Sequence, residues 1–218
     1  MTQRLAVFDC DGTLVDSQAN IGRAMDAAFR ASGLVPPPLA ATRQIVGLSL
    51  YEAMQVLLPT ADEPAHRKLA QDYKSAFDDL RQTDRLDPEP LFEGIADVLA
   101  TLIDRGWRLG VATGKSDRGL ARVLASHGIA DRFVTLQTAD RHPSKPDPSM
   151  LIAAMDEAGV PAQDSAMIGD TSFDMAMARA AGCRAIGVAW GYHGVADLAA
   201  AGADVVATHA SELPGMLA

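Results

Sequence analysis

Short apolar runs alternate with longer helical patterns through most of this chain, and that alternation restricts the fold more than any other feature. The runs have the length and the β-branched composition of buried strands, and they lie at residues 4–8, 107–112, 133–137, 165–169, 185–189 and 203–207. Between them, apolar residues recur at spacings of three and four over 94–105, 116–127, 147–158 and 172–181. Strands that alternate with helices form parallel sheets with crossover connections. We therefore predict an α/β fold with a Rossmann-like, doubly wound, mostly parallel sheet.

The alternation stops between about residue 18 and residue 85, where helical patterns and loops occur without a strand pattern. A loop containing Pro36, Pro37 and Pro38 interrupts the helical patterns, and the stretch "DRLDPEPLFEG" marks the return of the alternation. We predict that residues 1–15 and 86–218 form the Rossmann-like core domain. Residues 16–85 would form an inserted all-helical domain.

Charge and composition exclude several classes of partner. The formal charge of −9 and the pI of about 4.9 argue against a nucleic-acid surface, which needs clustered Lys and Arg. A small anionic substrate would need a local cation to offset the general field. The chain has no long apolar run for a bilayer and no export pattern at its start, so we expect no membrane partner and a cytoplasmic location. The only two cysteines, Cys10 and Cys183, are expected to be reduced thiols.

Polar side chains follow or precede the predicted strands at points that can converge. Asp9 and Asp11 follow the first strand, Thr113-Gly114 follow the second, and Lys145 lies in the loop before the strand at 165–169. Two further carboxylates, Asp170 and Asp174, follow that strand. In open parallel sheets, ligands bind outside the carboxyl ends of the strands. The sequence therefore predicts one site at this edge of the sheet.

The carboxylates of this site suggest a metal and a nucleophile. Mg²⁺ prefers hard anionic oxygens such as those of Asp9 and Asp170, with Asp174 as a further ligand or as support for one. Asp9 and Asp11 stand two apart on an extended chain, so their charges would raise a pKa unless a cation or a proton intervenes. We expect Asp9 to attack phosphorus as a carboxylate nucleophile. Asp11 would then carry a proton to the leaving oxygen.

Other residues at the same strand ends are suited to bind a phosphate. Thr113 offers a hydroxyl and, with Gly114, backbone N–H groups near the start of a helix. Gly12-Thr13 allows a tight turn with exposed N–H donors, and Lys145 supplies a positive charge. Lys115 either contacts the substrate or only begins the following helix.

The motifs "DCDGTLVDS", "VATGK", "SKPDP" and "GDTSFDMAMARAAG" together resemble the four motifs of the haloacid dehalogenase-like superfamily, in order over the whole chain. The chain is most similar to its phosphoglycolate phosphatase-like and β-phosphoglucomutase-like branch, in which a helical C1 cap stands between the first two motifs. The resemblance implies that Asp9 is the nucleophile, Asp11 the general acid and base, Thr113 a phosphate-binding residue and Lys145 the charge stabiliser. It also implies a Mg²⁺ site formed by Asp9, the backbone carbonyl of Asp11, Asp170 and Asp174.

The same resemblance points to the cap segment "TRQIVGLSL", with Arg43 and Gly47, as a substrate-specificity loop. Arg43 could bind a substrate carboxylate with two hydrogen bonds. The chain has "TGK" where this branch commonly has "TNK", so Gly114 removes a side-chain amide near the phosphate and leaves the substrate open.

The leading hypothesis is a Mg²⁺-dependent phosphatase acting on a small phosphate monoester, with 2-phosphoglycolate as one candidate. The alternatives are a phosphomutase of the β-phosphoglucomutase type and a non-catalytic phosphate-binding module. A dehalogenase is disfavoured because it needs neither a metal nor a second, proton-donating aspartate. The sequence sets no oligomeric state.

Overall fold

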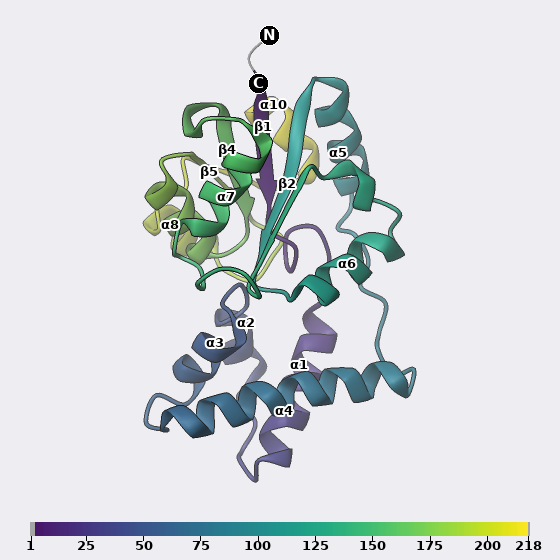
Figure 1. The fold of residues 1–218 in the computed structure, drawn as a ribbon, viewed down its shortest axis with the longest axis vertical. Coiled ribbons are helices and arrows are strands. Elements are labelled where there is room, and N and C mark those ends of the chain that lie inside the picture. The colour runs from purple at the N-terminus through teal and green to yellow at the C-terminus, as the bar shows by residue number, and fades with distance from the viewer. Residues whose placement is uncertain (1–2, 218) are drawn as a thin grey trace.

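A computed structural model describes residues 3–217 and contains one parallel sheet in the order β3-β2-β1-β4-β5-β6 (Figure 1). All five pairings between neighbouring strands are parallel, which confirms the predicted α/β, Rossmann-like fold. The strands are β1 (Arg4–Phe8), β2 (Trp107–Thr113), β3 (Thr135–Thr138), β4 (Ser165–Gly169), β5 (Arg184–Val188) and β6 (Val205–Ala207).

The first strand lies at the centre of the sheet. Phe8 is opposite Val111 on one side and Ile168 on the other, so β1 pairs with both β2 and β4. Four of its five residues are buried, because its side chains alternate between two apolar layers: Ala6 and Phe8 face one, and Leu5 and Val7 face the other. The chain first builds one half of the sheet and then crosses to the other half at β4. This reversal of strand order creates a ligand-binding crevice at the carboxyl ends of β1 and its neighbours.

Helices cover both faces of the sheet (Figure 1). Apolar side chains of α5, α6 and α10 pack in the layer that contains Phe8, and those of α7, α8 and α9 pack in the layer that contains Val7. The bounds are α5 (Ile95–Asp104), α6 (Asp117–Ser126), α7 (Ser149–Ala158), α8 (Ser172–Ala181), α9 (Val195–Ala200) and α10 (Leu213–Met216). Single 3₁₀ turns lie at η1 (Ala130–Arg132), η2 (Ala162–Asp164) and η3 (Ala210–Glu212).

Four helices lie between β1 and α5, at the carboxyl ends of the strands (Figure 1). They are α1 (Gln18–Ala31), α2 (Leu39–Gln44), α3 (Leu50–Leu57) and α4 (Glu63–Gln82). They pack around an apolar cluster that is separate from the two sheet layers and contains Met25, Ala28, Phe29, Ile45, Ala53, Met54 and Leu69. The helical insert therefore has buried apolar contacts of its own.

The long helix α4 shows why this segment is helical. Asp62 is its N-cap and accepts a hydrogen bond from the backbone N–H of Ala65 at 3.0 Å, and Pro64 stands in the first turn. Its exposed face carries an ion pair between Glu63 and Arg67 at helical spacing. One apolar stripe, which includes Leu69, faces the other helices of the insert.

The sequence expectations differ from the structure at one short helix and at the starts of β3 and β6, and β3 begins at Thr135, two residues later than expected. The segment expected to be a specificity loop begins inside α2, so Arg43 lies on a helix rather than in a loop. This helix has only six residues and no side-chain cap, so it is too short to show a helical repeat of apolar residues in the sequence. The last strand is also shorter than expected, because β6 begins at Val205.

Within residues 3–217, every helix is too short or too polar to cross a bilayer.

Candidate active site

Asp9 is the first residue after β1 and is almost completely buried. Its backbone N–H continues the sheet by donating to Ile168 O at 2.9 Å, and its side-chain Oδ1 accepts from the N–H of Cys10 at 2.6 Å. The chain then turns, because Leu14 N–H donates back to Cys10 O at 2.9 Å. This combination fixes the Asp9 carboxylate at the central strand end of the sheet.

Gly12 allows this turn to pass close to the other strand ends. Its φ of +83° is in the left-handed region, where side chains other than that of glycine are strained. A Cβ at this position would collide with Asp170 Oδ2 and lie 2.5 Å from the ring of Tyr192. The sequence therefore needs glycine here for both backbone conformation and space.

Asp170 follows β4 and is held by two donors from different segments. Thr13 Oγ1 donates to its Oδ1 at 2.8 Å, and the N–H of Tyr192 donates to its Oδ2 at 2.8 Å. The carboxylate is fully buried. Both bonds orient it toward the end of β1.

Lys145 lies between two carboxylates and is itself 1% exposed. Its Nζ is 3.0 Å from Asp9 Oδ1 and 2.7 Å from Asp174 Oδ1. Asp174 is fixed from its other side, because Oδ2 accepts from the backbone N–H of Thr171 at 3.0 Å and from Thr171 Oγ1 at 2.7 Å. This capping box at the start of α8 ties the Asp174 position to the helix. The structure thus brings the first, third and fourth predicted motifs into contact.

Burial shapes the electrostatics of this group. Desolvation, reinforced by the charges of Asp174 and Asp11, raises the pKa of Asp9 from 3.8 to about 7 despite the nearby ammonium of Lys145. Burial, together with the charges of Asp9 and Asp174, also raises the pKa of Asp170 well above its ordinary value. For Lys145, burial alone would favour the neutral amine, but Asp174 and Asp9 outweigh it and raise its pKa. The site therefore holds excess negative charge that an additional cation would offset.

Three of these carboxylates form a group that fits a divalent cation. One oxygen each of Asp9, Asp170 and Asp174 lies within 4.8 Å of the other two. Within the described residues, Asp9 Oδ2 is buried and has no hydrogen-bond partner. A buried carboxylate oxygen without a donor is costly unless a cation or a proton neutralises it. The residues present therefore match the oxygen ligands of a hard divalent cation.

Asp11 faces a different direction from Asp9. Its Oδ1 accepts a hydrogen bond from Ser17 Oγ and is 2.8 Å from Lys115 Nζ. Tyr192 OH lies 3.2 Å from the same Ser17 hydroxyl. Asp11 stands outside the three-carboxylate group, and its side chain lies beside Lys115 at the wall of a cavity. The expectation that the backbone carbonyl of Asp11 is a metal ligand stays a prediction.

Thr113 and Gly114 end β2 beside the first motif. Thr113 is fully buried, and its Oγ1 accepts from Lys115 N–H at 3.2 Å. A Cβ on Gly114 would lie 2.7 Å from Leu48 O and 2.9 Å from Gly47 O. The absence of a side chain at Gly114 therefore lets the loop of the helical insert approach the core.

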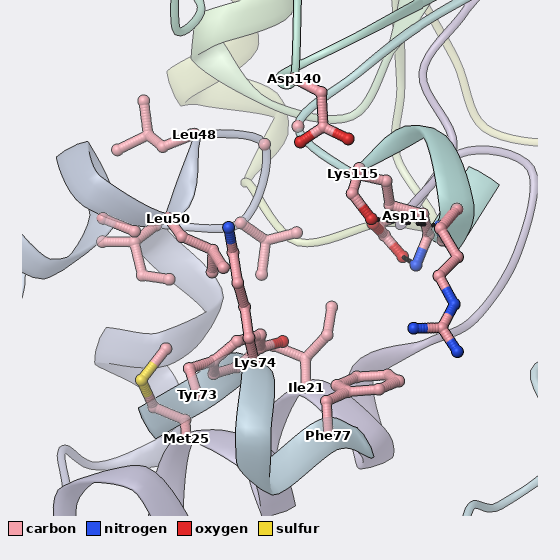
Figure 2. A pocket seen from close by; sticks show the side chains of 18 of the residues that line it. Asp11, Ile21, Met25, Leu48, Leu50, Tyr73, Lys74, Phe77, Lys115 and Asp140 are labelled. Carbon is pink, nitrogen blue, oxygen red and sulfur yellow. Dashed lines mark hydrogen bonds and ion pairs between the residues drawn. The ribbon is translucent and has the colours of Figure 1, made fainter. Parts of the chain in front are cut away.

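A cavity of about 370 Å³ lies between the insert and the sheet (Figure 2). Asp11, Lys115, Gly114 and Gly47 line it, whereas Asp9 does not. Figure 2 shows Asp11 and Lys115 on one side of this space, opposite the side chains that α1 and α4 contribute. The cavity thus reaches the reactive centre from the side of Asp11.

The structure does not bring every predicted residue to this cavity. Arg43, expected to bind a substrate carboxylate, is absent from the residues that line it. Gly12 and Thr13, expected to bind phosphate, lie next to the buried carboxylates, where the Thr13 hydroxyl donates to Asp170. The sequence alone assigns no role to Ser17, which contacts Asp11, or to Tyr192, which contacts Asp170 from a segment without a motif. The motif "DCDGTLVDS" ends in Ser17, but the sequence does not show that the Ser17 hydroxyl faces Asp11.

Comparisons with known proteins agree with this arrangement. The family model described as Haloacid dehalogenase-like hydrolase matches residues 6–188. The chain belongs to the haloacid dehalogenase-like hydrolase family. Among its haloacid dehalogenase-like relatives, "Probable phosphatase IndB" of Dickeya dadantii is 37% identical over 97% of this chain and 92% of the relative. "Phosphoglycolate phosphatase" of Vibrio vulnificus is 32% identical over 98% of this chain and 96% of the relative.

Solved structures show the same fold. The crystal structure of a predicted phosphatase from Clostridium acetobutylicum has a TM-score of 0.88 at 24% identity and covers 100% of this chain and 99% of its own. At this identity the likeness concerns the fold alone.

Proposed function

We propose that this haloacid dehalogenase-like hydrolase is a Mg²⁺-dependent phosphatase that hydrolyses a small-molecule phosphate monoester through an aspartyl-phosphate on Asp9. The names of the relatives from Dickeya dadantii and Vibrio vulnificus support a phosphatase, and the second makes 2-phosphoglycolate a candidate substrate. The observation that carries the proposal is the buried Asp9 Oδ2, which lacks a partner within the described residues while Lys145 holds Oδ1. This leaves one carboxylate oxygen of Asp9 without a protein partner, available to the cation or to phosphorus.

Asp9, Asp170 and Asp174, with the backbone carbonyl of Asp11, would hold Mg²⁺. When bound, the cation would neutralise carboxylate and phosphate charge and hold the phosphoryl group next to Asp9. A divalent cation, the Lys145 ammonium and the three carboxylates would together carry no net charge, so the anionic phosphate would enter a site with balanced charge.

Each of the predicted residues would have its own role in the reaction. An oxygen of Asp9 forms a bond to phosphorus while the bond from phosphorus to the alcohol oxygen breaks. Asp11 gives its proton to that leaving oxygen and, in the second half, takes a proton from the water that attacks the aspartyl-phosphate. Lys145 keeps a positive charge 3.0 Å from Asp9 Oδ1 throughout. Thr113 and the N–H groups of the Gly12-Thr13 turn would bind the phosphate oxygens.

The helical insert, residues 16–85, would act in this proposal as a cap domain over the site. The close approach of Gly47 O and Leu48 O to Gly114 supports this role, because it covers the carboxyl end of β2. Such a cover excludes water from the reacting groups. We also propose a cytoplasmic location, in keeping with two buried cysteines, Cys10 and Cys183, that are free thiols.

The test is inorganic phosphate release from a panel of phosphate esters with Mg²⁺, comparing wild type with Asp9→Asn. Because asparagine cannot attack phosphorus, we expect kcat to fall by at least about a thousandfold. Asp131→Asn changes an exposed aspartate in η1 and should retain wild-type turnover. Phosphate release at the wild-type rate by Asp9→Asn would refute the assignment of Asp9 as the nucleophile. Conversion of a sugar phosphate with little net phosphate release would indicate the mutase alternative.

A further inference from the structure

The cavity beside Asp11 is the place where the alcohol part of the substrate must lie, because Asp11 serves the leaving oxygen in the proposed function. Residues from α1, α3 and α4 and from the loop and helix after β2 enclose it. Its volume of about 370 Å³ lies within the range of about 300–1,000 Å³ that is typical of sites for drug-sized ligands. A leaving group as small as glycolate would fill little of this space.

The part of the cavity nearest the insert is apolar and aromatic. Ile21 and Met25 of α1 and Tyr73 and Phe77 of α4 lie together along it (Figure 2). The Tyr73 and Phe77 rings have their centroids 6.0 Å apart and are tilted by 44°. Aromatic side chains of this kind offer a large apolar contact area to a planar ligand. The alcohol part of the substrate is therefore expected to have an apolar, ring-sized body.

The end of the cavity formed by α4 and α6 is positively charged. Arg81 of α4 and Arg118 and Arg122 of α6 line it. Arg81 is ion-paired with Asp78, but Arg118 and Arg122 form no ion pair within residues 3–217. The Nη2 group of Arg122 is also buried without an acceptor among the described residues. These guanidinium groups thus have unused donors at the cavity wall.

The three arginines also affect one another. Burial lowers the pKa of Arg122, and the charges of Arg81 and Arg118 lower it further. Lys74 also lines the cavity, and in Figure 2 its side chain extends from α4 toward the side of Leu48 and Leu50. Such a concentration of cations is notable in a chain with a formal charge of −9. Like charges at this range repel one another, and an anion bound between the arginines would offset the repulsion that Asp78 offsets only in part.

We propose that the substrate carries a second anionic group, on a ring-sized apolar body, and that Arg118 and Arg122 bind this group while Tyr73 and Phe77 contact the body. The proposal rests on the proposed function, because it places the ester phosphate at Asp9. The structure favours such a dianionic ester over phosphoglycolate, whose carboxylate is next to the reacting phosphate. The guanidinium groups would each donate charge-assisted hydrogen bonds to a carboxylate or a phosphate.

Two esters of matched shape test the second anion. In para-carboxyphenyl phosphate the ring carries a carboxylate, and in para-carbamoylphenyl phosphate the same position is neutral. We expect kcat/KM for phosphate release with Mg²⁺ to be higher for the charged ester by about tenfold or more, the value of one charged hydrogen bond. Phosphoglycolate should have a lower kcat/KM than the charged aromatic ester.

Variants assign the effect to the arginines. In the double variant Arg118→Gln, Arg122→Gln, the ratio of the two kcat/KM values should fall toward one. Both positions are at least partly exposed, so folding should be retained, and a circular dichroism melt checks it. Arg30→Gln removes an exposed arginine of α1 that pairs with Asp26 away from the cavity, and it should leave the ratio unchanged.

Each outcome separates the two proposals. Equal kcat/KM for both aromatic esters, with turnover that depends on Asp9, would overturn the second-anion proposal and leave the phosphatase intact. A ratio that survives in the double variant would overturn the assignment to Arg118 and Arg122. If kcat/KM were higher for phosphoglycolate than for the charged aromatic ester, the proposal of a ring-sized body in the substrate would be overturned. No phosphate release from any ester would overturn the proposed function and this inference together.

Discussion

At the scale of single residues, Lys145 is the side chain on which the buried charge balance depends. It is 1% exposed and contacts both Asp9 and Asp174, which are buried as well. A buried ion pair contributes little net stability when intact, but removal of one partner leaves an uncompensated charge. Lys145 is therefore expected to matter for folding as well as for catalysis.

We expect Lys145→Met to lower the free energy of unfolding by about 3–5 kcal/mol at pH 8, measured by denaturant titration. The loss should be smaller at pH 5, because Asp9, whose pKa is raised to about 7 by burial, is then protonated and needs no counter-charge. Adding Asp174→Asn to this variant should restore part of the stability by removing one of the unpaired carboxylates. An equal loss at both pH values would contradict this account of the charge balance.

Gly12 tests how tightly the first turn is packed against Asp170. In Gly12→Ala the new Cβ would lie within clashing distance of Asp170 Oδ2 and would strain a backbone with φ of +83°. We expect the free energy of unfolding to fall by about 1–3 kcal/mol in a denaturant titration. The affinity for Mg²⁺, measured by calorimetry, should fall as well. Gly33→Ala is the matched control, because Gly33 has φ of +71° but nothing within 4 Å of the added Cβ. If both variants bind Mg²⁺ like wild type, Asp170 is not a ligand.

At the scale of secondary-structure elements, the sequence predicts regular segments well. The pattern at 172–181 matches α8, and α4 lies within the helical patterns predicted between about residue 18 and residue 85. Both have strong start signals, a capping box at Thr171 and an N-cap aspartate followed by proline at α4. The short helix α2 lacks such a signal, because Pro38 is its N-cap and makes no side-chain hydrogen bond.

In the candidate site, too, some residues could be predicted from the sequence and others could not. Asp9, Lys145 and Asp170 follow from their positions at strand ends, because the carboxyl ends of parallel strands meet at one edge. The contacts of Lys115 and Tyr192 could not be predicted, since they depend on side-chain direction and on the path of a loop after β5. Three arginines on α4 and α6 meet only because the insert folds over the core. Long-range contacts of this kind have no local sequence pattern.

The helical insert should behave as a separate cooperative unit if residues 16–85 form a domain. Met54 is fully buried in its apolar cluster, so Met54→Ala should lower stability by about 2–5 kcal/mol. Hydrogen exchange should accelerate in α1, α3 and α4 and stay nearly unchanged in β1 and β4. Met167→Ala, in a fully buried position of β4, should show the reverse pattern. Uniform acceleration through the whole chain by Met54→Ala would argue against the division.

At the scale of the whole molecule, an acidic chain folds around a buried cluster of carboxylates. The folded state keeps a proton on Asp9 up to about pH 7, whereas the ordinary pKa is 3.8. Between these values the folded state binds more protons than the unfolded state, so the contribution of Asp9 to stability falls as pH rises. A divalent cation can replace that proton only when Asp9 is ionised.

We therefore expect Mg²⁺ to raise the melting temperature more at pH 8 than at pH 5. Without a divalent cation, wild type should lose stability relative to Asp9→Asn as the pH increases from about 4 to about 7. Thermal melts across this pH range, with Mg²⁺ or with chelator, measure both effects. The Asp9→Asn protein serves as control, since it lacks the titrating carboxyl. A Mg²⁺ effect that is independent of pH would contradict the proposed link between the cation and Asp9.

The most direct test of the central claim is to trap the covalent intermediate. Wild-type protein is mixed with ester and Mg²⁺, quenched within the first turnover, reduced with borohydride and digested for peptide mass spectrometry. Borohydride converts an acyl-phosphate to the alcohol, so the account predicts homoserine at position 9 in wild type and no such product without ester. Homoserine at another carboxylate, or unmodified Asp9 during a measured burst of phosphate release, would contradict it.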